Sequence, residues 1–116
     1  MDAHRIKRVA SLLRDELAEL VLHELKDPRI DTLLSITDVE VARDASFAKV
    51  FVSYYGDAAK RNEIIAALNH AAGFLQKEIA KRVKLRSTPR LAFYHDVSIE
   101  RGFRVTEVLK KIKHEP

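Results

Sequence analysis

A row of lysines carries the most distinctive chemistry in this sequence. Lys77, Lys81 and Lys84 are spaced four and three residues apart, so on a helix their ammonium groups would form one row. Three arginines add charge near the same end: Arg82, Arg86 and Arg90. The stretch between Glu78 and Asp96 contains no acidic residue that could neutralise them. The row predicts a face that docks onto a polyanion such as RNA, and an ordinary solvated helix surface is the alternative.

The positive charge of the chain is concentrated in one segment. The 116 residues carry a net charge of +4, and the isoelectric point is about 9.5. Residues 58–90 carry a net +6, whereas residues 31–57 carry a net −3. Residues 1–30 are neutral and residues 91–116 carry +1. This uneven distribution points to a polyanionic partner more strongly than the total charge does.

No group of residues matches a catalytic or metal-binding motif. His23-Glu24 begins like a zinc motif, but Asp27 stands where the second histidine would be required. There is no cysteine, which excludes disulfides, thiolate metal sites and cysteine nucleophiles. The five histidines lack metal-ligand spacing, and capping or turn roles suit the aspartates that could group: Asp27, Asp31 and Asp38. We therefore predict that the protein is not an enzyme, and we expect no cofactor and no metal.

The composition predicts a single globular domain spanning residues 1–116. The hydrophobic fraction is 47% and the charged fraction 33%, both ordinary for a globular protein. The charged start of the chain argues against a secretory signal, and no apolar run approaches the roughly 20 residues that span a bilayer. We expect a cytoplasmic protein with no membrane partner.

The elements that must position the lysine row follow from the hydrophobic pattern, which predicts the order α-β-β-α-β-α. We expect helices at residues 3–26, at residues 58–85 and after Ser98, and strands at residues 33–43, 47–55 and 90–97. Lys26-Asp27-Pro28 should end the first helix, and a bend is expected at Gly73 within the second. A two-layer arrangement, with helices on one sheet, would cover the apolar faces.

Details of the strands and of the aromatic residues give further expectations. The short turn Arg43-Asp44-Ala45-Ser46 predicts that the first two strands pair antiparallel, and Ile36, out of phase with Val39, predicts a bulge. Leu91, Phe93 and Val97 should share one side of the third strand. Phe74 and Tyr94 could stack on bases, but we predict core packing for both. Recognition of the RNA backbone and shape is therefore expected rather than base reading.

Several segments match a bacterial family along nearly the whole chain. They are Arg5-Ile6-x-Arg8-Val9, Leu25-Lys26-Asp27-Pro28-Arg29, Ile36-Thr37-Asp38-Val39, Asp44-x-x-x-Ala48-x-Val50, Ala71-Ala72-Gly73-Phe74-Leu75, and Leu85-Arg86-x-x-Pro89-x-Leu91-x-Phe93 with Asp96. Each segment is weak alone, but together they are highly specific. On these segments the chain resembles the ribosome-binding factor A (RbfA) family of bacteria.

The resemblance implies an α+β fold of the type II KH-like class, with helices packed on a three-stranded sheet. It implies that Ala71 and Gly73 shape a kink between two helices, and that the basic helix after the kink faces RNA. The family assists late maturation of the 30S small ribosomal subunit and is needed for efficient processing of 16S rRNA in its 5′ region. It binds free 30S subunits rather than translating ribosomes.

We therefore predict a non-enzymatic, monomeric assembly factor whose partner is 16S rRNA in free 30S or pre-30S subunits. The expected phosphate contacts are Lys77, Lys81, Lys84 and Arg86, followed by Arg82, Arg90, Arg5, Lys7 and Arg8. One alternative is a protein-interaction module, such as a dimerising regulator whose sheet edge pairs with another chain. A second alternative is an enzyme acting on small molecules, which would need a polar pocket with perturbed titrating groups.

Overall fold

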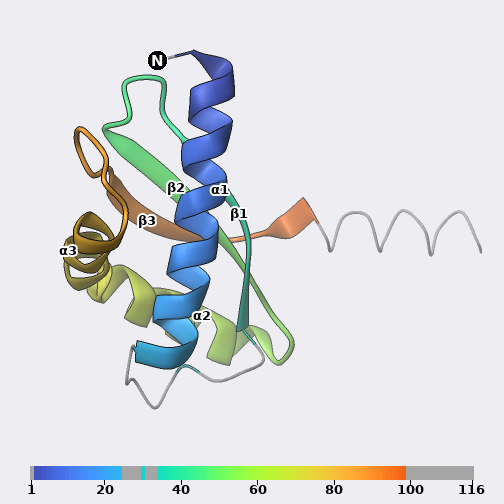
Figure 1. Cartoon of the computed structure of the whole chain (residues 1–116). Helices are drawn as coiled ribbons and strands as arrows, with labels where there is room; N and C mark the ends of the chain where they lie inside the picture. Colours follow the sequence, from blue (N-terminus) through green and yellow to red (C-terminus); the bar gives the residue numbers. More distant parts are fainter. Residues whose placement is uncertain (1, 25–29, 31–33, 99–116) are drawn as a thin grey trace, which may run out of the picture.

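A three-stranded sheet forms one layer of the molecule, and the helices form the other (Figure 1). The structure is a computed structural model that describes residues 2–24, 30 and 34–98. The elements, in chain order, are α1 (Ala3–Glu19), the π-helical turn η1 (Leu20–Glu24), β1 (Leu34–Val41), β2 (Phe47–Tyr54), α2 (Ala58–His70), α3 (Ala72–Arg82) and β3 (Arg90–His95). Of the predicted elements, the end of the first helix at Lys26-Asp27-Pro28 and the helix after Ser98 lie outside the described residues.

Two aspartates fix where the first helices begin. The Asp2 Oδ1 atom accepts a hydrogen bond from the Arg5 backbone N–H at 2.9 Å. The Asp57 Oδ1 atom likewise accepts from the Lys60 backbone N–H at 2.8 Å. Each carboxylate satisfies a backbone donor that the first helical turn leaves without a partner, and its charge suits the positive end of the helix dipole.

The strand order is β1-β2-β3, with β1 antiparallel and β3 parallel to the central strand β2. The predicted antiparallel hairpin is thus confirmed. The predicted bulge is also present, because the pairing of β1 with β2 shifts register between Ile36 and Asp38. Since β2 and β3 are parallel, the chain must cross from one end of the sheet to the other between them, and α2 and α3 form that crossover.

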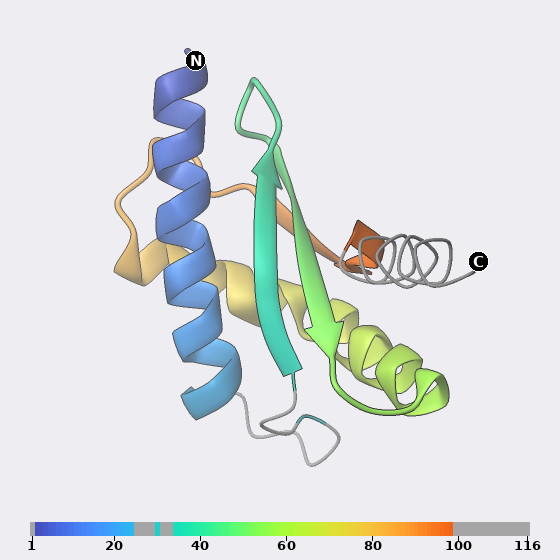
Figure 2. The same ribbon diagram turned by 90° about the vertical axis from the view of Figure 1, so that its right-hand side faces the viewer.

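The core lies between one face of the sheet and the helices. Strand residues that alternate along the sheet are buried on this face: Val39, Ala48, Val50, Val52, Leu91 and Phe93. They meet buried helix residues spaced three and four apart: Leu13, Leu17, Leu20, Ile64, Leu68, Leu75 and Ile79. Helix α1 packs on β1, and α2 and α3 pack on β3 (Figure 2). The opposite face of the sheet carries the intervening residues, which are half-buried or exposed.

The long second helix of the sequence pattern is two helices. The break falls at Ala71, which ends α2 and begins α3 with φ −86° and ψ 2°, rather than at Gly73. The Ala71 N–H still donates to the Ala67 carbonyl, and the Leu75 N–H donates to the Ala71 carbonyl, so the two helices join directly. Helix α3 ends at Arg82 instead of residue 85, because Val83 adopts an extended conformation with φ −118° and ψ 115°.

Three apolar residues differ from the predicted pattern and are substantially exposed. Strand β3 ends at His95, so Val97 does not follow Leu91 and Phe93 into the core and is exposed. The chain turns at Asp96, whose carboxylate accepts hydrogen bonds from the N–H and the hydroxyl of Ser98. The prediction of core packing for Phe74 and Tyr94 is also wrong, because their exposed fractions are 48% and 43%.

Asn69 joins the end of α2 to the outer edge of β3. Its Nδ2 atom donates to the Phe93 carbonyl at 3.1 Å, and its Oδ1 atom accepts from the Phe93 N–H at 2.8 Å. The side-chain amide thus pairs both backbone groups of a residue on an outer strand, as another strand would. Because Ala71 follows two residues later, this contact also fixes the helix break relative to the sheet.

Thr37 gives the β1 bulge a structural role. It is the residue that the register shift leaves out of the pairing with β2, and its Oγ1 atom lies 2.6 Å from the Asp96 Oδ2 atom. The Asp96 carboxylate therefore accepts hydrogen bonds from Ser98, which follows β3, and from Thr37 at the β1 bulge. The Ser98 hydroxyl first, and then the Thr37 hydroxyl, lower the pKa of Asp96 below its ordinary value of 3.8.

Replacing Asn69 should destabilise the fold. We expect Asn69→Ala to lower the free energy of unfolding by about 1–3 kcal/mol, because it leaves two part-buried backbone groups of Phe93 without a partner. Urea denaturation measures the change. The control is Asn62→Ala on the exposed side of the same helix, which should change the free energy by less than about 0.5 kcal/mol. Equal midpoints for the two variants would contradict the role of Asn69.

The hydrogen bonds of Asp96 should make the stability depend on pH. Since folding lowers the pKa of this carboxyl, its contribution is present above the ordinary pKa of 3.8 and is lost as the pH falls through the lower value of the folded state. Between about pH 5 and pH 2, Asp96→Asn should therefore lose less stability than the unmodified protein. Urea midpoints across this range test the expectation, with Glu40→Gln as the control on the same sheet face. Parallel curves for Asp96→Asn and the unmodified protein would reject it.

Candidate nucleic-acid interface

Only two of the three lysines in the predicted row lie on one helix. Lys77 and Lys81 are exposed on α3, one turn apart. Lys84 lies beyond the end of α3, after the extended residue Val83, so it does not continue the helical spacing. The expectation of three ammonium groups aligned on one helix is therefore wrong for Lys84, although its side chain is exposed.

Lys81 has an acidic neighbour on its own helix. Its Nζ atom lies 3.2 Å from the Glu78 Oε1 atom. The Lys81 side chain is 72% exposed, so this i,i+3 pair is screened by water and holds the ammonium group weakly. A phosphate could therefore replace the Glu78 carboxylate at little cost.

Arg82 forms ion pairs with two glutamates, one on α1 and one on η1. Its guanidinium donates a hydrogen bond to Glu24 of η1 and lies 3.7 Å from the Glu16 carboxylate of α1. The hydrogen bond to Glu24 is the main reason that the pKa of Arg82 is raised. Arg82 thus ties α3 to the first helix. The sequence could not show this pairing, because both glutamates are more than fifty residues away along the chain.

The other predicted RNA contacts are exposed and have no carboxylate partner within residues 2–24, 30 and 34–98. They are Lys77, Lys84, Arg86 and Arg90, together with Arg5, Lys7 and Arg8 on the first turns of α1. The structure brings Arg5 of α1 and Arg86 of the α3–β3 connector to one hollow. Lys7 lines a different hollow, beside Arg14 and Asp38. The N-terminal basic residues therefore face more than one direction.

The helix break presents both a small residue and an aromatic ring to solvent. Gly73 lies in the first turn of α3, and a Cβ atom added there would meet no atom within 4 Å. Phe74 follows it and is half-exposed, one turn before Lys77. Helix α3 also starts without a side-chain cap at Ala71. An exposed ring, an uncapped helix start and a lysine are groups that contact bases and phosphates of single-stranded RNA.

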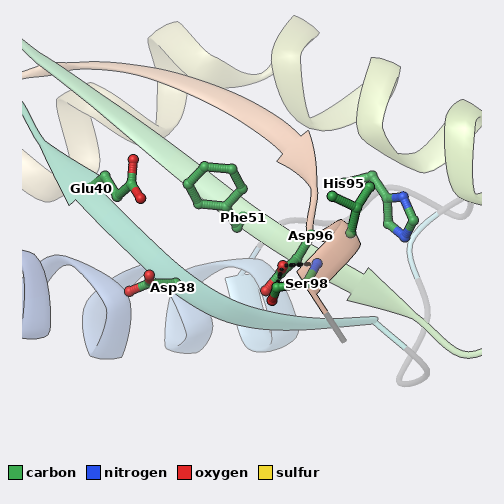
Figure 3. A pocket seen from close by; sticks show the side chains of 7 residues that line it. Asp38, Glu40, Phe51, His95, Asp96 and Ser98 are labelled. Carbon is green, nitrogen blue, oxygen red and sulfur yellow. Dashed lines mark hydrogen bonds between the residues drawn. The ribbon is translucent and has the colours of Figure 1, made fainter. Parts of the chain in front are cut away.

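Three carboxylates gather on the sheet face that points away from the described helices. Asp38, Glu40 and Asp96 line a hollow of about 390 Å³, together with Phe51. Figure 3 shows these side chains on the strands and just beyond β3. The Phe51 ring also packs against Tyr94, with centroids 6.1 Å apart. Three carboxylates around one hollow would repel an RNA backbone. Within residues 2–24, 30 and 34–98, this hollow is therefore a poor site for an RNA backbone, whereas the helix break and the basic end suit one.

The described part of the chain shows neither a metal-binding cluster nor a membrane-spanning helix. Residues 2–24, 30 and 34–98 contain no cluster of histidine, aspartate and glutamate that could hold a metal ion. Within the same residues, no helix is both long and apolar enough to cross a membrane.

Comparisons with a family model and with known proteins point to the same family. A family model described as Ribosome-binding factor A matches residues 5–109. The chain is 46% identical over 115 residues to Ribosome-binding factor A of Halothermothrix orenii, covering 99% of this chain and 93% of that protein. It is 42% identical over 109 residues to Ribosome-binding factor A of Caldanaerobacter subterraneus, covering 94% of this chain and 89% of that protein.

Solved structures agree with the sequence comparison. The crystal structure of ribosome-binding factor A from Thermus thermophilus aligns with a TM-score of 0.68 and 30% identity, covering 78% of this chain and 94% of that chain. A solution NMR structure from Thermotoga maritima aligns with a TM-score of 0.74 and 34% identity, covering 86% of this chain and 94% of that chain. The expected α+β, KH-like fold is thus confirmed. Sequence and fold together show that the chain belongs to the ribosome-binding factor A family.

Proposed function

We propose that this protein is a ribosome assembly factor that binds the 30S small subunit through 16S rRNA. A Thermus thermophilus homologue, 31% identical to this chain with a TM-score of 0.62, has been fitted into a cryo-electron microscopy map of a 30S–RbfA complex. The observation that carries the proposal to this chain is a set of exposed basic side chains, beside the helix break and at one end of the molecule, that have no acidic partner among the described residues. The protein then acts in the cytoplasm, where subunits mature.

The RNA contacts divide by their chemistry. Lys77, Lys84 and Arg90 supply charge to the phosphate backbone, and Lys81 joins them once Glu78 is displaced. Phe74 stacks on an unpaired base beside the kink at Ala71 and Gly73, in addition to the backbone contacts. Arg82 stabilises the fold instead of contacting RNA, since its charge is already matched by two glutamates.

The protein acts by binding and catalyses no reaction. A factor of this kind stabilises an immature rRNA conformation and leaves when the mature one no longer fits. It shifts that equilibrium only by the difference between its affinities for the two conformations. On this basis it binds free and immature 30S subunits in preference to translating ribosomes, and it assists late maturation and processing of 16S rRNA in its 5′ region. It works as a monomer, and Asn69 keeps part of the β3 edge from pairing with another chain.

Sedimentation tests the proposed partner. In a sucrose gradient of cell lysate, the protein should travel with free 30S subunits and be depleted from 70S and polysome fractions. Subunits isolated from cells that lack the factor should carry a larger share of unprocessed 16S rRNA. Migration only at the top of the gradient, at low salt and with excess subunits, would reject the function.

The basic side chains of α3 and its connector should set the salt dependence of binding. For Lys77→Ala/Lys81→Ala/Lys84→Ala, the slope of log K against log salt should fall in magnitude by about 2, at roughly 0.7 per lost phosphate contact for single-stranded RNA. Fluorescence anisotropy with a labelled RNA at several salt concentrations gives the slope. An unchanged slope in the triple variant would place the RNA on another face.

Replacing Arg82 should affect the stability of the fold rather than the affinity for RNA. Arg82→Ala should lower the thermal unfolding midpoint, because Glu16 and Glu24 lose the cation that ties the first helix to α3. At a temperature where the variant is folded, its affinity for RNA should change less than twofold. Lys77→Ala should do the reverse, with an unchanged midpoint and weaker RNA binding. A loss of salt slope in Arg82→Ala would contradict the assignment.

A further inference from the structure

Three arginines from distant parts of the chain surround a hollow at one end of the molecule. Arg5 comes from α1, Arg43 from the β1–β2 turn and Arg86 from the α3–β3 connector. Figure 1 shows these three segments at the same end, near the start of the chain. The hollow has a volume of about 390 Å³, within the roughly 300–1,000 Å³ of small-ligand sites.

The arginines have no partner in the described part of the chain. No carboxylate lies within ion-pair distance of Arg5, Arg43 or Arg86 there, in contrast to Arg82. Three like charges around one hollow repel one another, so these arginines do not stabilise each other there. Their shared hollow and the absence of a carboxylate partner among the described residues favour an anion that is supplied from outside the chain.

The one carboxylate at this hollow is committed elsewhere. The Asp44 Oδ1 atom accepts hydrogen bonds from the Ser46 N–H at 3.1 Å and from the Ser46 hydroxyl at 2.7 Å. The Ser46 hydroxyl is the main reason that the pKa of Asp44 is lowered. Asp44 stays charged and shapes the turn, so the lining residues keep an excess of two positive charges.

The floor of the hollow is apolar and rigid. Val9 and Leu85 line it while packing on the core, and the Ala45 side chain is 8% exposed. Ala45 has a φ of 59°, a left-handed conformation that strains an alanine more than a glycine. The turn is held in place on two sides: the Ala42 N–H donates to the Phe47 carbonyl at 2.8 Å, and the Arg90 N–H donates to the Ser46 carbonyl at 3.0 Å.

From these observations we infer that the hollow is a second RNA site, which binds one nucleotide of a single strand by its phosphate and its sugar or base. The three guanidinium groups and the Ser87 hydroxyl hold the phosphate. The sugar or base lies on the floor of Val9, Ala45 and Leu85. The Ala45 methyl group adds to that floor, which accounts for an alanine at a position where glycine would be less strained.

This inference rests on the proposed function, and it makes Arg43 an RNA-binding residue that the lysine pattern does not reveal. An RNA strand that contacts both the helix break and this hollow would run from α3 along the α3–β3 connector. Two separated contact points fix the direction of the RNA on the protein, which a single row of basic residues does not.

An NMR titration locates the site directly. With the trinucleotide UUU, the backbone amide signals of Ala45, Ser46 and Ser87 should shift, and uridine, which has no phosphate, should leave them unchanged. The same titration of Arg43→Ala should show about tenfold weaker binding at these signals. Arg43→Lys should fall between the two, since it keeps the charge but loses the planar fork. Shifts confined to α3, or equal shifts with uridine, would overturn the inference.

Binding to intact 30S subunits separates this inference from the proposed function. We expect Arg43→Ala to bind subunits several-fold more weakly than Lys49→Ala, which removes the same charge from the uncovered sheet face. Both variants should have the unfolding midpoint of the unmodified protein, because both side chains are exposed. If the unmodified protein fails to bind subunits, the proposed function falls. If it binds and the two variants are equal, only the nucleotide site falls.

Discussion

Burial of a single face of the sheet is the constraint on which the rest of this structure depends. Alternate residues of the three strands pack against apolar stripes of α1, α2 and α3, so these three helices lie on one side of the sheet. The parallel pairing of β3 with β2 then requires a crossover, and two helices fill it. The helix break must sit at the outer edge of β3, where Asn69 pairs with Phe93. The position of the kink is therefore a consequence of sheet topology.

The same constraint separates the charges. On the face away from the described helices, Asp38, Glu40 and the Asp96 carboxylate gather around one hollow, whereas most of the predicted RNA contacts lie on α3, on the connector and on the first turns of α1. RNA is thereby repelled from that hollow and attracted to the basic residues, which orients the protein before any close contact forms. Within the basic region, ion pairs make a further selection. Arg82 is neutralised by Glu16 and Glu24, and the cations that have no carboxylate partner within residues 2–24, 30 and 34–98 are those available to a ligand.

The sequence predicts features that depend on neighbours along the chain and misses those that depend on distant ones. The order of elements from the first helix to the third strand, the hairpin and the bulge at Ile36 follow from local periodicity and turn residues, and the described residues confirm them, with the second helix divided in two. Where a helix stops is set by tertiary contact. The pattern runs to residue 85, but the chain leaves the helix after Arg82 to reach β3. Phe74 and Tyr94 look like core residues by type, and only the fold shows that they face away from it. The pairing of Arg82 has no local signal at all.

Arg43 is a functional residue that, for the same reason, cannot be predicted from its neighbours along the chain. It stands in a segment with a net charge of −3, flanked by Asp44, and nothing in its surroundings along the chain suggests an anion site. The carboxylate of Asp44 turns toward Ser46, and the hairpin carries Arg43 to the end of the molecule where Arg5 and Arg86 lie. Charge counted along a sequence measures the attraction of a segment for a polyanion at long range. A specific contact depends instead on which guanidinium groups the fold brings together without a partner, and that selection is made by the turn and the connector rather than by the lysine row.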